Sequence, residues 1–213
     1  MNIAVVLAGG VGSRYGGNLP KQYCMLNGKE VIAYAIEAAK KSKKTDKVLI
    51  VCDRSYQERL AREYGTEVCD GGNTRNISVY NALAYIKERG YDCKKIIFLD
   101  SARPLIRAEL IDEYMDKLDE YDCVITGQKI VDSLGKVGMR YVDREDYYLI
   151  QTPEACNFPL LCSSFDKDSD RTAICQLMPE NSSLYVSYAM KNNMKVTYMG
   201  DLELVGKFLE ERV

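Results

Sequence analysis

Apolar runs of strand length alternate with amphipathic runs of helix length along the first 126 residues. Strands are predicted at residues 3–7, 48–51, 66–69, 96–99 and 123–126. Helices are predicted between them, at residues 31–39, 56–64, 77–86 and 110–118. Such alternation is typical of an α/β fold, here a Rossmann-like, mainly parallel sheet flanked by helices on both faces. Ligands of such sheets bind at the carboxyl ends of the strands.

The pattern changes after residue 126. Residues 131–151 are polar, punctuated by glycine and rich in Tyr and Val, which predicts a projecting β-hairpin arm. A helix is then predicted at residues 183–192, a strand at 195–198 and a final helix at 202–209. No repeat or linker divides the chain, so residues 1–213 are expected to form one domain carrying the arm. We expect the arm to join two subunits into a homodimer; the alternative is a plain surface excursion.

Charge and composition narrow the classes of function. The net charge of −2 gives no long-range attraction to nucleic acid or to a membrane surface, so neither is expected as a partner. No run of about 18 apolar residues occurs, and no membrane span is predicted. The absence of histidine excludes imidazole acid–base chemistry and His-containing triads, but not phosphoryl or nucleotidyl transfer. The eight cysteines form no C-x-x-C pair, so we expect reduced thiols in a cytoplasmic protein.

The stretch LAGGVGSRYGGNLPKQY, residues 7–23, directly follows the first predicted strand. Its backbone N–H groups can approach an anion closely at three glycines, Gly9, Gly10 and Gly12. Arg14 and Lys21 bracket the loop and Pro20 restricts the backbone before Lys21, which together predict a cradle for a triphosphate. The stretch is neither a Walker A motif nor a dinucleotide fingerprint, because Tyr15 stands at the last glycine position of the latter. A tight strand-to-helix turn would use the same glycines.

The loop also carries a resemblance to a known family. G-G-x-G-S-R followed by L-P-K-Q resembles the signature loop of nucleotidyltransferases that activate sugar or polyol phosphates, and L-P-K-Q is most similar to their CTP-dependent branch. That branch contains the 2-C-methyl-D-erythritol 4-phosphate and ribitol-5-phosphate cytidylyltransferases. Further motifs follow in the family's order, GGNTRNISV at 71–79, LDSARP at 99–104, QTPE (resembling Q-T-P-Q) at 151–154, SDRTAIC at 169–175 and NNMKVT at 192–197.

The resemblance implies a nucleotide-diphospho-sugar transferase type of fold and a role for each matching residue. It implies a nucleotide site made of Ala8, Gly9, Gly10, Gly12, Gly72, Asn73, Ser78 and Asp100. It implies catalytic cations at Arg14, Lys21 and Lys195. It implies an acceptor site made of Arg103, Ser169 and Asp170, completed by Arg144 and Thr152 from the partner subunit's arm. Asp100, at the end of a strand, is also the candidate ligand for a Mg²⁺ held with the CTP phosphates.

The implied reaction moves CMP from CTP to a small sugar-alcohol phosphate and releases pyrophosphate. The L-A-G-G start of the loop and residues 169–175 favour ribitol 5-phosphate as acceptor, with Arg171 as an added cation, whereas Ser78-Val79 favours 2-C-methyl-D-erythritol 4-phosphate. The two acceptors would serve cell-surface polymer and isoprenoid precursor synthesis, respectively. The alternatives are a nucleotidyltransferase of the same fold that uses another NTP and a non-catalytic nucleotide- or sugar-phosphate-binding module. The glycine spacing disfavours a dinucleotide-dependent oxidoreductase.

Overall fold

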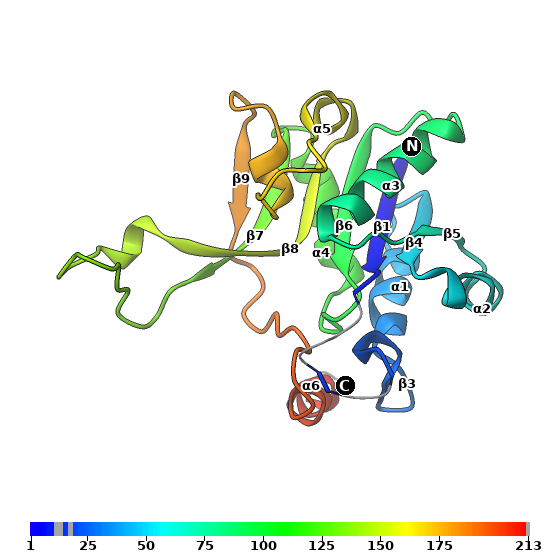
Figure 1. Ribbon diagram of the computed structural model, residues 1–213, viewed down its shortest axis with the longest axis horizontal. Coiled ribbons are helices and arrows are strands. Elements are labelled where there is room, and N and C mark those ends of the chain that lie inside the picture. Colours follow the sequence, from blue (N-terminus) through cyan, green and yellow to red (C-terminus); the bar gives the residue numbers. More distant parts are fainter. Residues whose placement is uncertain (11–14, 17–18, 212–213) are drawn as a thin grey trace.

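The computed structural model describes residues 1–10, 15–16 and 19–211. At its centre is a seven-stranded sheet in the order β5-β4-β1-β6-β8-β7-β9 (Figure 1). The strands are β1 (Asn2–Ala8), β4 (Lys47–Cys52), β5 (Glu67–Asp70), β6 (Lys95–Asp100), β7 (Cys123–Lys129), β8 (Tyr148–Asn157) and β9 (Leu184–Ser187). Strands β5, β4, β1 and β6 are parallel, β8 is antiparallel to β6 and β7, and β9 is parallel to β7. The predicted α/β class with a mainly parallel sheet is confirmed.

Helices cover both faces of the sheet (Figure 1). They are α1 (Val31–Lys41), α2 (Arg54–Tyr64), α3 (Arg75–Glu88), α4 (Ala108–Lys117), α5 (Phe158–Ser164) and α6 (Asp201–Glu210). Shorter pieces are the hairpin of β2 (Met25–Leu26) and β3 (Lys29–Glu30), and the 3₁₀ turns η1 (Lys21–Tyr23), η2 (Arg144–Asp146) and η3 (Ile174–Leu177). No helix in the described part of the chain is long and apolar enough to span a membrane.

Strand β1 illustrates why both faces of the sheet are covered. Ile3 and Val5 belong to a core cluster shared with α3 and α5, and Ala4 and Val6 belong to the cluster shared with α1 and α4. A strand buried on both faces reads as a continuous apolar run, as this one does. The two packed layers fix the carboxyl end of β1, where the glycine-rich loop begins.

The predicted arm projects from the body of the molecule (Figure 1). Its base is formed by β7 and β8, which remain paired out to Lys129 and Tyr148. Between these strands, residues 130–147 contain η2 and an isolated bridge from Lys136 to Met139. The strands of the hairpin are therefore extensions of two strands of the central sheet.

Two elements predicted near the C-terminus are wrong. Residues 183–192 do not form a helix, because β9 pairs with β7 there; Gly127 on β7 leaves room for Val186, whose Cγ1 would lie 2.5 Å from an added Cβ. Residues 195–198 are not a strand, because the backbone N–H groups of Thr197 and Tyr198 donate to the Asp201 carboxylate in a turn that leads into α6. The pattern also failed to predict α5 and the inner half of β8.

A buried hydroxyl pair connects α4 to the two strands of the arm's base. The Tyr114 hydroxyl lies 2.8 Å from Thr126 Oγ1, which donates to the carbonyl of Pro153 at 2.9 Å. Tyr114 and Thr126 are both fully buried, so water cannot replace either partner.

We therefore expect Tyr114→Phe to lower the free energy of unfolding by about 1–2 kcal/mol, since it leaves the Thr126 oxygen with one partner fewer. Urea unfolding followed by circular dichroism measures the change. The matched control is Tyr198→Phe at an exposed tyrosine, for which we expect no loss. Equal effects in the two variants would contradict the stabilising role of the buried pair.

Candidate active site

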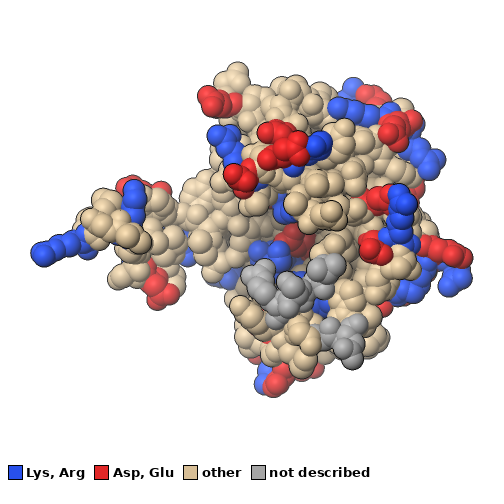
Figure 2. All heavy atoms as spheres, viewed as in Figure 1, with Lys and Arg blue, Asp and Glu red and all other residues tan. Residues whose placement is uncertain are grey.

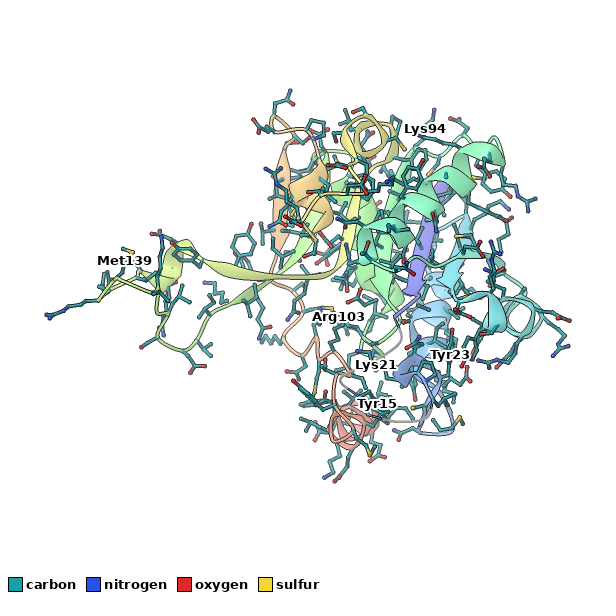
Figure 3. All side chains as sticks on the ribbon, viewed as in Figure 1. Tyr15, Lys21, Tyr23, Lys94, Arg103 and Met139 are labelled. Carbon is teal, nitrogen blue, oxygen red and sulfur yellow. The ribbon has the colours of Figure 1, made fainter. Side chains whose placement is uncertain are left out.

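A cavity of about 580 Å³ lies where β1, β5 and β6 end. It is lined by residues from five places in the chain, the main ones being Gly9, Gly10, Lys21, Gln22, Gly72, Asn73, Arg75, Ser78, Asp100 and Lys195. Figure 3 shows Tyr15, Lys21 and Arg103 at this end of the sheet, opposite Lys94. In Figure 2, basic side chains surround acidic ones in a hollow at the centre of the visible face. The cavity is therefore at the carboxyl edge at which the sequence predicts a ligand.

The start of the glycine-rich loop is held by one buried side chain. Gln22 donates from Nε2 to the carbonyls of Ala8 and Gly10, both at 2.9 Å, and is almost completely buried. Gln22 lies in η1, so the same contact places Lys21 at the edge of the cavity. The predicted loop residues Gly12 and Arg14 lie outside the described residues.

Three backbone segments approach one another closely beside this loop. A Cβ at Gly9 would lie 3.2 Å from Ser78 Oγ and 3.3 Å from Gly71 Cα, and a Cβ at Gly72 would lie 2.2 Å from Ile77 Cγ2. Only glycine fits such approaches without displacing its neighbours. The predicted nucleotide residues Gly9 and Gly72 thus have a steric reason for being glycine.

The first turn of α3 faces the cavity. Its N-cap Thr74 accepts from the N–H of Ile77, and Ser78 Oγ accepts from the N–H of Gly72 at 3.0 Å while donating to the Thr74 carbonyl. Asn73, Thr74 and Arg75 all line the cavity. A helix N-terminus carries partial positive charge and points N–H groups outward, so this side of the cavity suits a phosphate or another anionic group.

Asp100 is the acidic centre of the site. Lys195 Nζ lies 2.8 Å from its Oδ2, and Arg103 Nε lies 3.4 Å from the same atom. Burial alone would raise the pKa of Asp100, but the charges of Lys195, Arg75 and Arg103 outweigh burial and hold this pKa well below its usual range. Asp100 is therefore ionised at neutral pH and fixes the position of Lys195.

The site has a limited capacity for metals of its own. Within residues 1–10, 15–16 and 19–211, no group of three or more His, Cys, Asp or Glu could hold a metal ion. Asp100 alone offers one carboxylate beside the cavity, and it already accepts from two cations. This donor set fits a Mg²⁺ that takes most of its oxygen ligands from a bound triphosphate and water.

Several predicted acceptor residues do not line the main cavity. Arg103 is nearly buried beside it and also donates to the carbonyl of Asn193. Thr152 is buried within β8, in the body of the subunit, so it does not belong to the projecting part of the arm as expected. Arg144 is on the arm and donates to the Val131 carbonyl.

The segment of residues 169–175 packs against the start of α3. Ser169 and Asp170 are both outside the lining of the main cavity, and Asn76 binds the backbone carbonyl of Ser169. Arg171, expected as an added cation at the acceptor end, instead donates to the Gln176 carbonyl and lines a different cavity with Cys123 and Cys175. The structure thus brings most predicted nucleotide residues together and leaves the acceptor residues around their margin.

Arg75 is the main site residue that sequence reasoning missed. It lines the cavity and forms an ion pair of 2.9 Å with Glu154, which is almost completely buried. The signal was present, because Arg75 is the arginine of GGNTRNISV. Gln22 was missed in the same way within L-P-K-Q, since its role is a contact with backbone 12 and 14 residues earlier in the sequence.

Comparison with known proteins identifies relatives over nearly the whole chain. A ribitol-5-phosphate cytidylyltransferase from Lacticaseibacillus paracasei is 28% identical over 100% of this chain and 99% of its own length. A 2-C-methyl-D-erythritol 4-phosphate cytidylyltransferase from Lachnospira eligens is 27% identical over 99% of this chain and 100% of its own. The crystal structure of 4-diphosphocytidyl-2C-methyl-D-erythritol synthase from Anaerococcus prevotii shares the fold, with a TM-score of 0.83 over 99% of this chain and 98% of that one at 20% identity.

The family comparison covers nearly the whole chain. The model of the family described as IspD, 2-C-methyl-D-erythritol 4-phosphate cytidylyltransferase, matches residues 2–211. This span includes all the elements that line the cavity. The chain therefore belongs to the 2-C-methyl-D-erythritol 4-phosphate cytidylyltransferase family and is a nucleotidyltransferase.

Proposed function

We propose that this enzyme transfers CMP from CTP to the phosphate of a small sugar alcohol and releases pyrophosphate. The observation that carries the proposal is the cavity itself, in which Lys21, Arg75 and Lys195 surround a glycine-lined backbone and the ionised Asp100. A ribitol 5-phosphate type of acceptor is favoured and 2-C-methyl-D-erythritol 4-phosphate comes next. Support for this order comes from the start of the glycine loop, from residues 169–175 and from the ribitol-5-phosphate enzyme among the relatives.

The reaction joins two anions, so charge repulsion is its main obstacle. An oxygen of the acceptor phosphate attacks the α-phosphorus of CTP, and the bond to the pyrophosphate oxygen breaks. Lys21 and Lys195 neutralise charge that accumulates on the α-phosphate oxygens, and the N–H groups at the start of α3 hold the nucleotide. Arg14, the arginine of the G-G-x-G-S-R motif, is also proposed to bind the triphosphate. The attacking phosphate needs no general base, consistent with a chain that has no histidine.

Mg²⁺ is the proposed cofactor. Asp100 would hold the ion, because its carboxylate is ionised and lies beside the cavity. When bound, Mg²⁺ supplies charge neutralisation across the triphosphate. Asp100 would then hold both Lys195 and the ion beside the bound nucleotide.

A homodimer through the arm is the proposed assembly. Apolar side chains stand exposed along the arm, with Val137 fully accessible and Val131 and Tyr141 at 79% and 74%. Such exposure disfavours an isolated arm in water and favours a partner, here a second copy of the chain. In that dimer, Arg144 would reach the partner's acceptor site, which Arg103, Ser169 and Asp170 form from the other side.

The acceptor panel is the direct test of the proposed function. We expect purified protein with Mg²⁺ to release pyrophosphate from CTP with ribitol 5-phosphate, more slowly with 2-C-methyl-D-erythritol 4-phosphate, and not after EDTA is added. ATP, GTP and UTP serve as controls for the nucleotide. Release from another NTP alone would identify a different nucleotidyltransferase, and binding without release would identify a non-catalytic module.

Removing one cation from the cavity tests the electrostatic mechanism. We expect Lys195→Ala and Lys21→Ala each to lower kcat by about 10²–10³-fold, because each removes a charge that stabilises the transition state. Lys191→Ala is the matched control, since Lys191 is an exposed lysine outside the cavity lining. Near-normal turnover by a folded Lys195 or Lys21 variant would remove that lysine from the catalytic group.

Charges placed on the apolar arm test the assembly. We expect the double variant Val137→Asp with Tyr141→Asp to have half the molar mass of the wild-type protein by light scattering, because burying two carboxylates in an interface is unfavourable. Tyr198→Asp, at an exposed tyrosine on the body, should leave the mass unchanged. A wild-type protein of monomer mass would contradict the proposed dimer.

A further inference from the structure

The acceptor segment, which we define as residues 169–175, is attached to the start of α3 by a buried amide. Asn76 is 4% exposed and donates from Nδ2 to the carbonyls of Ser169 and Arg171, both at 2.8 Å. These bonds connect positions more than 90 residues apart in the sequence. Asn76 therefore holds the backbone of residues 169–171 against the start of α3.

A second attachment runs through a carboxylate on β8. Glu154 accepts from Arg75 Nη2 at Oε1, 2.9 Å away, and from the N–H of Ile174 at Oε2, 2.7 Å away. Arg75 in turn donates from Nη1 to the carbonyl of Thr172. One ion pair, buried at its Glu154 end, therefore holds both the start of α3 and the second half of the acceptor segment.

The groups around Glu154 require a carboxylate rather than a carboxamide. Both of its oxygens face N–H donors, from Arg75 and from Ile174. A glutamine would turn its NH₂ group toward one of these donors and leave a buried donor unsatisfied. Burial raises the pKa of Glu154, opposed by the charge of Arg75 and the Ile174 N–H, while the charge of Asp100 adds to the increase. The charge of Arg75 thus acts in the direction that favours the carboxylate form of Glu154.

Arg75 connects Glu154 and the acceptor segment to the main cavity. Arg75 lines the main cavity, and its guanidinium bonds to the acceptor segment and to Glu154. Because the cavity is the proposed CTP site, a shift of this side chain would change the distance between the nucleotide and the segment. Displacements of about 1 Å in such distances are enough to slow a transfer reaction strongly.

We propose that Glu154 and Asn76 are positioning residues that hold the acceptor segment at its working distance from the nucleotide site. Neither residue lines the main cavity. They act through Arg75 and through the backbone of the segment, and the inference rests on the proposed function for the identity of the acceptor. Their loss should weaken use of the acceptor more than use of CTP.

The test compares two Glu→Gln variants of the whole enzyme. We expect Glu154→Gln to raise the acceptor KM about tenfold, the equivalent of one unsatisfied buried donor, with a much smaller change in the CTP KM. The control is Glu67→Gln, because Glu67 also accepts from a cation, Lys47 at 2.9 Å, and from the Tyr91 hydroxyl at 2.6 Å, but far from the main cavity. This control should leave both KM values unchanged.

Hydrogen–deuterium exchange supplies a readout that needs no substrate. The N–H of Ile174 donates to Glu154, so we expect amides of the acceptor segment to exchange faster in Glu154→Gln and in Asn76→Ala, but not in Glu67→Gln. Asn76→Ala also covers the case in which Glu154→Gln fails to fold, and it should raise the acceptor KM in the same direction.

The outcomes separate this inference from the proposed function. Unchanged exchange in the acceptor segment, or equal increases in the KM of CTP and of the acceptor, would overturn the positioning role. Absence of pyrophosphate release from the wild-type enzyme would count against the proposed function instead, because the exchange comparison does not depend on turnover.

Discussion

A carboxylate almost removed from water cannot stay ionised without partners, and Asp100 sets this condition for the whole site. Asp100 lies at the end of β6. Its partners are Arg103, three residues later in the chain, and Lys195, 95 residues later. The backbones of the same two segments are also joined, since the Val196 N–H donates to the Ala102 carbonyl. Satisfying one buried charge therefore brings the C-terminal segment across the edge of the sheet and places a lysine beside the cavity.

The second constraint is steric and concerns the backbone rather than charge. Gly9, Gly71 and Gly72 bring the ends of β1 and β5 and the start of α3 within contact distance, where any Cβ would collide or crowd. Gln22 then fixes the departing loop by its two carbonyl contacts. Close backbone approach brings main-chain groups to the cavity wall, which the side chains of Lys21, Arg75 and Lys195 also line. In the proposed function, the backbone would recognise the nucleotide and the side chains would neutralise its charge.

Local pattern was sufficient for the part of the fold in which strands and helices alternate. β1, β4, β6 and the helices between them follow from apolar runs and helical spacing, because each element is buried in the way its own residues dictate. The same reasoning failed where tertiary contacts decide. β9 forms because Gly127 on another strand accepts Val186, and residues 195–198 avoid the sheet because Asp201 captures two of their N–H groups.

The site shows the same difference between residues that local pattern predicts and residues that tertiary contacts place. Glycine loops and strand ends predicted most of the segments that line the cavity, since each motif lies within a few residues of the end of a strand there. The acceptor side depends on contacts such as Arg75 with Glu154 and Asn76 with Ser169, which join positions 79 and 93 residues apart and leave no periodic signal. Arg103 shows the consequence: its motif indicates a phosphate ligand, yet its side chain lies against Asp100. The contacts of Asn76 and Arg75 fix the backbone of the acceptor segment, whose residues lie outside the lining of the main cavity, so the proposed choice of acceptor depends on how this segment is held.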